Sequence, residues 1–370
     1  MKQKVMGVIN LIHEQDELES LTRGRCLATV PFGARYRLID FILSSMVNSG
    51  ISKVAVFAHT KYRSLMDHLG SGKHWDLHHR QSGLFVLPPA TDDIHEISRG
   101  DLYHFYQHRD YFNRSPLEYV VITRSHMVCN IDFEPVIAYH EEKGADITVV
   151  CKQQRGMTTG KTRKVNMKDD GRITAIQDHY GRMLSDISCM EMYIMKKDLL
   201  MELVETSLAQ GQDHLVRHAI FSRIDKLNVY GYMYEGYLGA VNTISSYYQN
   251  NMNLLTPEVW RQLFFQPGPI FTKVKDEPPA RYLEGSLVSN SLIANGCLIE
   301  GTVINSVLFR GVHVRKGAVI KNSIIMQNGE IGVNGSVNYG VLDKDVRIEQ
   351  GRDIQGSVSS PFLAAKRKVI

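Results

Sequence analysis

"SNSLIANGCLIEGTVINSVLFRGV", residues 289–312, is the stretch that decides the fold of this chain. Around it, apolar residues recur every six positions, and Asn, Gly and Ser stand between them. The recurring positions form three runs: Leu287, Ile293 and Ile299; Leu308, Val314, Ile320 and Met326; and Leu342, Ile348 and Ile354. A period of six fits neither the repeat of a helix nor the alternation of a strand. It is typical of a parallel β-helix, in which each face of a triangular coil takes about six residues and stacks on the next coil.

The alternative is a set of ordinary hairpins with Gly and Asn turns, but three runs with the same period favour the β-helix. We therefore expect residues 283–370 to form a β-helix. The prolines between Pro267 and Pro279 mark a linker, which we place at residues 256–282. Residues 1–255 then form a separate domain.

Short apolar runs alternate with helical patterns in residues 1–255. "KVAVFAHT" at 53–60, "EYVVITRS" at 118–125 and "ADITVVCKQ" at 145–153 read as strands, whereas 36–50 and 133–144 read as helices. Strand, helix and strand at this spacing predict crossover units and a mostly parallel sheet. We therefore expect an α/β domain with helices on both faces of the sheet.

Composition excludes several classes of protein. The net charge is only +4, too weak to indicate binding to nucleic acid. No apolar run approaches the ~18 residues of a membrane span, and residues 1–20 read as a strand and not as a secretory signal. The five cysteines are scattered, without a CxxC pair, which favours a reducing, cytoplasmic location and argues against a zinc site.

The segment after the first expected strand lacks a phosphate loop. In nucleotide-binding α/β proteins this strand runs into a glycine-rich turn, whose backbone N–H groups approach the phosphates. Here no glycine occurs between Gly7 and Gly24, and "HEQDELES" at 13–20 carries four carboxylates. Such a segment would repel a triphosphate.

Five segments, at 20–59, 69–89, 244–255, 276–312 and 316–327, together make the chain similar to bacterial glucose-1-phosphate adenylyltransferase, also called ADP-glucose pyrophosphorylase. The resemblance covers nearly all of the chain. It implies a Rossmann-like α/β nucleotidyltransferase domain followed by a left-handed β-helix, in a tetramer that makes ADP-glucose from ATP and glucose 1-phosphate for glycogen biosynthesis. Such an enzyme uses magnesium held by carboxylates.

The chemical motifs of that family are altered here. Its glycine run is replaced by the acidic segment 13–20, and its Arg-Ala-Lys-Pro motif has Leu27 in place of lysine. Its metal-binding Gly-Asp-His falls on 124–126, where Ser125 replaces the aspartate and Arg124 offers a cation in the place of a metal. Near the expected second metal carboxylate, only Glu235 is acidic, and it stands too early.

Two further motifs are also changed. The sugar-phosphate Glu-Lys-Pro falls on Asp178, His179 and Tyr180, and Gly-Thr-Ala-Asp falls on 100–103 as Gly-Asp-Leu-Tyr. The chain therefore resembles the non-catalytic, D-type subunit of the family, which pairs with a catalytic subunit. By this reading no residue is catalytic, and the degenerate positions are Leu27, Ser125, Asp178 and His179.

Arg25 and Arg37 correspond to the family's anion-binding effector site between the domains; the alternative is a solvated basic face. His74, His78 and His79 have the spacing of metal ligands, but no carboxylate or cysteine completes a set, so we expect no metal.

The leading hypothesis is a cytoplasmic regulatory and structural subunit with no cofactor of its own. Its expected partner is the catalytic, magnesium-using subunit, in a homo- or heterotetramer. A small anionic effector is a further expected ligand. We expect the chain to bind neither nucleic acid nor membranes. The alternative is an active adenylyltransferase with an atypical phosphate loop. A hexapeptide-repeat acyltransferase is disfavoured because the coil contains only one histidine, His313.

Overall fold

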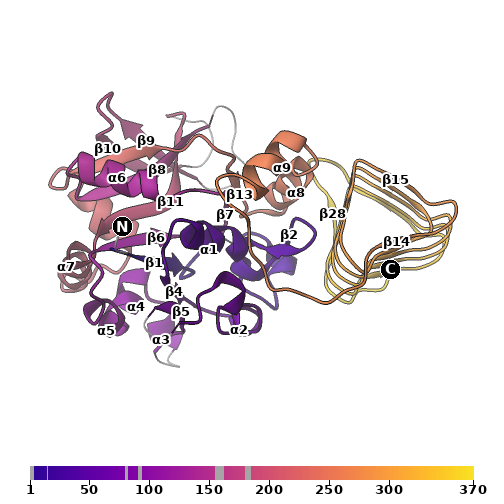
Figure 1. The fold of residues 1–370 in the computed structure, drawn as a ribbon, viewed down its shortest axis with the longest axis horizontal. Helices are drawn as coiled ribbons and strands as arrows, with labels where there is room; N and C mark the ends of the chain where they lie inside the picture. Colours follow the sequence, from indigo (N-terminus) through magenta and orange to yellow (C-terminus); the bar gives the residue numbers. More distant parts are fainter. Residues whose placement is uncertain (1–3, 15, 80–81, 91–93, 155–161, 180–184) are drawn as a thin grey trace.

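The computed structural model describes residues 4–370 except 15, 80–81, 91–93, 155–161 and 180–184. An α/β domain lies at one end, and a triangular coil of short strands lies at the other (Figure 1). The α/β domain and the parallel β-helix expected from the sequence are both present.

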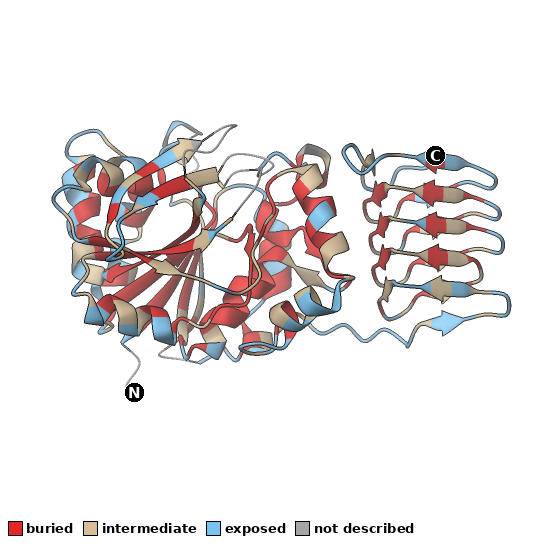
Figure 2. Ribbon diagram, turned by 90° about the horizontal axis from the view of Figure 1, so that it is seen from above, coloured by how far each residue is buried: buried red, intermediate tan, exposed pale blue. Residues whose placement is uncertain are grey.

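The α/β domain is built on a nine-stranded sheet with the order β10-β9-β11-β6-β1-β4-β5, to which β8 and β12 add beyond β11. Strand β1 (Val5–Asn10) lies between β4 (Lys53–Phe57) and β6 (Tyr119–Thr123), parallel to both, and β5 (Gly83–Leu87) follows β4. All six residues of β1 are buried, because helices cover both faces of the sheet (Figure 2).

The sequence predicted a mostly parallel sheet, but the other half of the sheet contains antiparallel strands. Strand β11 (Ile187–Lys196) runs antiparallel to both β6 and β8 (Ile147–Gln153). The chain reaches β11 through an antiparallel pair, β9 (Thr162–Met167) and β10 (Ile173–His179), instead of through a helical crossover. Strand β12 (Val229–Met233) pairs parallel with β8. The sheet is therefore mixed.

Helices on the two faces define two apolar clusters. Met6 and Val8 of β1 face one cluster, with α4, α5 and α7, whereas Val5 and Ile9 face the other, with α1, α2 and α6. This alternation follows from the two-residue period of a strand. The helices are α1 (Leu38–Asn48), α2 (Arg63–Leu69), α3 (Ile94–Ile97), α4 (Asp101–Gln107), α5 (Arg109–Asn113), α6 (Glu134–Glu142) and α7 (Lys197–Leu208). Among the described residues, no helix has the length and apolar content that crossing a membrane requires.

Short elements and two helices close the domain toward the coil. The small strand pairs are β2 (Pro31–Phe32) with β3 (Tyr36–Arg37) and β7 (Met127–Val128) with β13 (Gly239–Ala240). Helices α8 (Ile244–Asn253) and α9 (Pro257–Phe264) follow. The interval 256–282, taken as a linker, thus contains α9 and the first strand of the coil, and residues 265–280 join them without helix or strand.

The β-helix consists of three parallel five-stranded sheets. The first contains β14 (Arg281–Tyr282), β17 (Leu298–Ile299), β20 (His313–Val314), β23 (Glu330–Ile331) and β26 (Arg347–Ile348). The second contains β15 (Leu287–Ser289), β18 (Thr302–Ile304), β21 (Val319–Lys321), β24 (Ser336–Asn338) and β27 (Asp353–Gln355). The third contains β16 (Leu292–Ile293), β19 (Val307–Leu308), β22 (Ile324–Ile325), β25 (Gly340–Leu342) and β28 (Phe362–Ala364).

Two of the apolar residues that recur every six positions do not fill the coil interior. Leu287 is 56% exposed, and Val288 beside it packs against the interior. Met326 is buried outside the coil, against the first domain, and Ile325 fills the interior instead. The reason is that the sides of a coil differ in length. Val303 and Ile320 are register partners on successive coils, and they are 17 residues apart. A strict period of six would need 18 residues for three sides, so it drifts out of phase with the coil.

The outer face of the third sheet packs against the first domain. Val307, Phe309 and Met326 of the β-helix join a buried cluster with Phe32 and Tyr247 of the α/β domain. The Tyr248 hydroxyl also donates to the Asn322 carbonyl at 2.7 Å. The two domains therefore share a continuous apolar interface.

Candidate functional site: a cleft filled by its own loop

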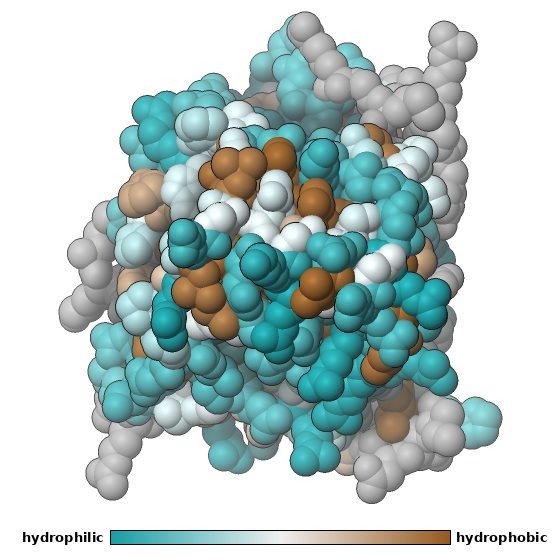
Figure 3. All heavy atoms as spheres, turned by 90° about the vertical axis from the view of Figure 1, so that its right-hand side faces the viewer, coloured by the Kyte–Doolittle hydropathy of each residue, from teal (hydrophilic) through white to brown (hydrophobic). Residues whose placement is uncertain are grey.

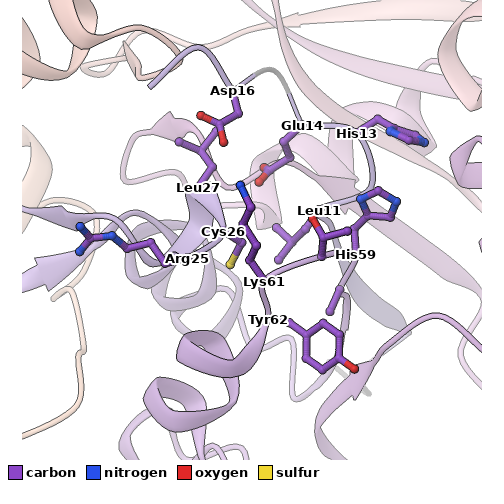
Figure 4. Close-up of a pocket in the computed structure, with 12 residues that line it drawn as sticks. Leu11, His13, Glu14, Asp16, Arg25, Cys26, Leu27, His59, Lys61 and Tyr62 are labelled. Carbon is purple, nitrogen blue, oxygen red and sulfur yellow. The ribbon is translucent and has the colours of Figure 1, made fainter. Parts of the chain in front are cut away.

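A cleft lies where β1 and β4 end, at the carboxyl edge of the parallel strands, the usual place for ligands in such sheets. Leu11, His13, Glu14 and Asp16 from the loop after β1 line it, together with Lys61 and neighbouring residues after β4 (Figure 4). Its volume is about 200 Å³. Ligand sites for small molecules usually measure about 300–1,000 Å³, so this cleft is narrow for a nucleotide.

The Glu14 carboxylate lines the cleft and is held by Ser125, which follows β6. It accepts hydrogen bonds from the Ser125 backbone N–H at 2.7 Å and from the Ser125 hydroxyl at 2.8 Å. The Glu14 side chain is 5% exposed, and His126 Nδ1 lies 3.6 Å from its Oε1 atom. The segment without glycine thus folds inward and places a negative charge beside Ser125, the position that matches the family's metal aspartate.

The two positions at which the family resemblance places magnesium ligands carry no carboxylate here. Ser125 offers a hydroxyl that is already bonded to Glu14, and β13, which pairs with the strand after Ser125, carries only Gly239 and Ala240. Glu235 lines a different groove. In the described part of the chain, no three His, Cys, Asp or Glu side chains are grouped to hold a metal ion.

Arg124 is not a free cation standing in for a metal. Its guanidinium donates to the carbonyl groups of Asn10 and Ile12 and pairs with Asp101 at 3.3 Å. Asp101 also accepts from the Asn10 amide and from the Leu215 backbone N–H. This network ties the end of β1 to α4 and to the segment before Phe221, so it has a structural role.

The remaining degenerate positions are also engaged in structure. Leu27 is buried in the cluster between the domains. Asp178 pairs with Arg163 at 2.8 Å and with Arg217 at 3.1 Å, and Arg163 also pairs with Glu191. These contacts satisfy the Asp178 carboxylate without a sugar phosphate. The side chain of His179 and all of Tyr180 lie outside the described residues.

Imidazole rings form a row along the edge of the cleft. The ring of His13 lies 4.7 Å from that of His59 and 6.2 Å from that of His214, and His59 lies 5.9 Å from His104. The side chains of His59 and His104 contact the Ile97 carbonyl, which fastens the segment before α4. Burial lowers the pKa of His59, His104 and His214, because a desolvated imidazole resists protonation.

We expect this row to make the fold sensitive to acid. An unfolded histidine has a pKa of about 6.5, so below that pH the unfolded chain binds more protons than the folded one and the free energy of unfolding falls. Unfolding in urea at about pH 7.5 and about pH 5.5 measures the loss. His104→Gln should reduce it, whereas His79→Gln, at an exposed ring, should not; equal losses in the wild type and His104→Gln would contradict the assignment.

Arg25 and Arg37 lie together where the two domains meet. Arg25 is buried, donates through Nε to the Leu21 carbonyl and forms an ion pair with Asp343 of the β-helix. Arg37 donates to the Ser64 carbonyl at 2.8 Å. Burial and the neighbouring Arg25 charge both lower the pKa of Arg37. The two arginines are therefore neighbours, and neither lies on a fully solvated face.

Two of the histidines noted in the sequence for their spacing lie beside a carboxylate, and Asp40 holds the start of a helix. His78 and His79 are half-exposed and lie 3.7 and 3.4 Å from Asp76, so the expectation that no carboxylate stands beside them was wrong. Asp40 accepts from the Arg37 backbone N–H and pairs with His68 at 2.6 Å, which fixes the start of α1.

A mixed α/β sheet with a cleft at its strand ends, joined to a β-helix of hexapeptide repeats, defines the nucleotidyltransferase class. Residues 16–256 match the family described as nucleotidyl transferase, and residues 278–358 match the family described as GlmU-like, C-terminal hexapeptide. The chain belongs to the nucleotidyl transferase family, in the group of the GlgD relatives of glucose-1-phosphate adenylyltransferase.

Three relatives illustrate this. The chain is 39% identical to the glycogen biosynthesis protein GlgD of Bacillus subtilis over 98% of this chain and 96% of the relative. It is 42% identical to GlgD of Geobacillus stearothermophilus over 86% of this chain and 84% of that relative. It is 34% identical to the glucose-1-phosphate adenylyltransferase of Thermomicrobium roseum over 90% of this chain and 79% of that relative.

Sequence reasoning missed the partners of the key residues. It flagged the acidic segment but not that Glu14 would bind Ser125, and it gave no role to Asp343 or Lys344. One signal was present: Asp343 follows Leu342 by one residue, as Phe309 follows Leu308, so its place on the outer face of the coil could have been read from the repeat.

Proposed function

We propose that this chain is a non-catalytic regulatory and structural subunit of a glucose-1-phosphate adenylyltransferase in glycogen biosynthesis. The observation that carries the proposal is the contact of Glu14 with Ser125, in which the loop after β1 folds into the cleft and leaves a negative charge where a triphosphate would have to lie. The relatives named glycogen biosynthesis protein GlgD support the pathway. In this proposal the chain needs no cofactor of its own, and magnesium acts at the catalytic partner.

The proposed partner is the catalytic subunit, in a tetramer in the cytoplasm. Both domains of the family are kept while residues at its chemical motifs are replaced, so surfaces are what the chain supplies in this proposal. The face that the β-helix turns away from the first domain carries apolar side chains among polar ones (Figure 3), and Tyr282 and Leu287 at the start of the coil are exposed. Exposed apolar groups of this kind suit a contact with another subunit.

The proposed effector is a small anion at the junction of the two domains. Arg25 and Arg37 supply guanidinium groups, which bind phosphate and carboxylate groups in a bidentate manner. An effector that contacts both domains can bias the arrangement of the assembly only through a difference in affinity between its states.

Mixing this chain with a catalytic relative from the same organism tests the proposal. We expect light scattering to detect a mixed oligomer and the mixture to respond to anionic effectors differently from the catalytic subunit alone. Arg37→Ala should remove that difference, whereas Arg23→Ala, at an exposed arginine, should not. Failure to assemble at micromolar concentrations would refute the partnership, and ADP-glucose synthesis by the chain alone would favour the alternative of an active enzyme.

A further inference from the structure

A second groove lies at the end of β12, distinct from the cleft that Glu14 lines. Its walls come from the residues around the end of β12, from the start of α6, and from α9 with the chain just after it. Its volume is about 460 Å³, within the usual range of small-molecule sites. Among the described residues, none that lines this groove also lines the cleft at β1 and β4. The groove is therefore a separate candidate site.

Two tyrosines give the groove an aromatic wall. Tyr232 lies in β12 and Tyr234 follows the strand, two positions on, and both pack against the same buried apolar cluster, as residues on one face of a strand do. The Tyr232 ring stands edge-on to the Tyr139 ring, with 5.6 Å between the ring centroids. The Tyr234 hydroxyl donates to the Asn130 carbonyl at 3.0 Å. The rings are therefore held in place before a ligand binds, which lowers the entropic cost of binding.

Two carboxylates face the same wall. Asp132 and Glu235 both line the groove. Burial, and then the charges of Asp132 and Glu235, raise the pKa of Tyr232, so both acids lie close to this phenol. An ionised carboxylate only accepts hydrogen bonds. The groove therefore offers acceptors to a ligand that brings donors.

A buried amide on the groove lacks one of its hydrogen bonds. Asn130 lines the groove and is 2% exposed. Its Nδ2 group donates to the carbonyls of Leu263 at 3.0 Å and Gly268 at 2.6 Å, and these two bonds fix the orientation of the amide. Its Oδ1 atom is buried without a partner in the described part of the chain. A buried acceptor without a partner is costly, so this atom also favours a ligand with hydroxyl donors.

The lining selects against anions and in favour of a neutral polyol. None of the described residues that line the groove is Lys, Arg or His, so a phosphate would meet carboxylates without a compensating cation. Lys152 lies nearby, but its Nζ atom donates to the carbonyls of Glu235 and Gly236. A sugar ring combines apolar C–H faces, which pack on aromatic rings, with hydroxyl groups, which donate to carboxylates and amides.

We propose that this groove binds a hexose unit of a neutral oligosaccharide, with the sugar ring packed on Tyr232 and its hydroxyl groups donating to Asp132 and Glu235. Asn130 Oδ1 is a further acceptor for the sugar. That the sugar belongs to an α-1,4-linked glucan rests on the proposed function in glycogen biosynthesis. In this arrangement the chain holds its catalytic partner on the polymer for which ADP-glucose is made. Several such grooves in one assembly bind several glucan chains, which raises the overall affinity without new contacts.

Calorimetric titration of the full-length chain with maltoheptaose tests the inference. We expect saturable binding at millimolar sugar that is the same at low and high salt, because a neutral ligand forms no ion pair that salt could screen. Tyr232→Ala should weaken binding at least about tenfold. Tyr230→Ala is the matched control, since Tyr230 lies on the same strand but does not line the groove, and it should bind as the wild type does. Absence of binding, or equal binding by Tyr232→Ala and the wild type, would overturn the proposal.

Glu235→Ala gives a second test that does not depend on the folding of the Tyr232 variant, because Glu235 is exposed. Loss of a charged acceptor should weaken maltoheptaose binding about tenfold. Glu134→Ala is its control, because Glu134 is an exposed carboxylate at the start of α6 that does not line the groove. Putrescine, a diamine, is the competing probe: if putrescine binds in a salt-dependent manner and maltoheptaose does not, the acids select a cation and the sugar assignment is wrong.

Two comparisons separate the source of the sugar from the proposed function. Binding of maltoheptaose but not of cellopentaose supports an α-glucan, whereas equal binding of both keeps the hexose site and rejects that source. Sugar binding by a chain that does not assemble with a catalytic subunit keeps this site and rejects the regulatory role. Assembly with a catalytic subunit without sugar binding rejects this site and keeps the regulatory role.

Discussion

ADP-glucose synthesis by the purified chain, supplied with ATP, glucose 1-phosphate and magnesium, should stay below about 1% of the rate of a catalytic relative. Losing a single group that stabilises the transition state costs roughly 10²–10³ in rate. Here the phosphate loop, the lysine at position 27 and the metal aspartate at 125 are all replaced, and Glu14 occupies the cleft. Such losses are not additive, but even the smallest of them brings the rate to the stated limit.

Ser125→Asp alone should not restore activity. The new carboxylate would replace the Ser125 hydroxyl, which lies 2.8 Å from Glu14 Oε1, and two carboxylates so close together repel each other. The double variant Glu14→Gln, Ser125→Asp removes the repulsion but still lacks a loop that holds the triphosphate. Magnesium-dependent turnover by Ser125→Asp would show that the loop matters less than we infer.

Phe309→Ala should destabilise the molecule by about 3–5 kcal/mol, the usual cost of truncating a buried phenylalanine. Phe309 is fully buried between the β-helix and the first domain, in the cluster with Phe32 and Tyr247. The lost contact should also let the β-helix separate, so that a protease cuts the connecting residues 265–280 faster. Urea unfolding and the rate of cleavage measure the two effects.

Val358→Ala is the control for this prediction. It shortens an aliphatic side chain in the same β-helix region at a position that is 56% exposed, where substitutions usually change stability by less than about 0.5 kcal/mol. Similar losses in Phe309→Ala and Val358→Ala would contradict an apolar interface centred on Phe309.

The sequence by itself determined the two architectures and showed that the residues at the family's motif positions are replaced. Both rest on local patterns: the repeat after residue 283 and the strand and helix periods before it, and the replacement of glycine, lysine and aspartate at fixed motif positions. Such signals are visible because helix, strand and turn preferences act over a few residues. Even so, the repeat was misread at Leu287 and Met326, because the unequal sides of the coil depend on how whole coils stack.

Tertiary structure decided which charges meet. Glu14 and Ser125 are brought together by the parallel pairing of β1 with β6, and Arg25 meets Asp343 only because the third coil docks on the first domain. The mixed half of the sheet likewise depends on β11 entering between β6 and β8. A buried charge takes its partner from whichever segment the fold brings beside it, and the residues next to it in the sequence do not determine that choice.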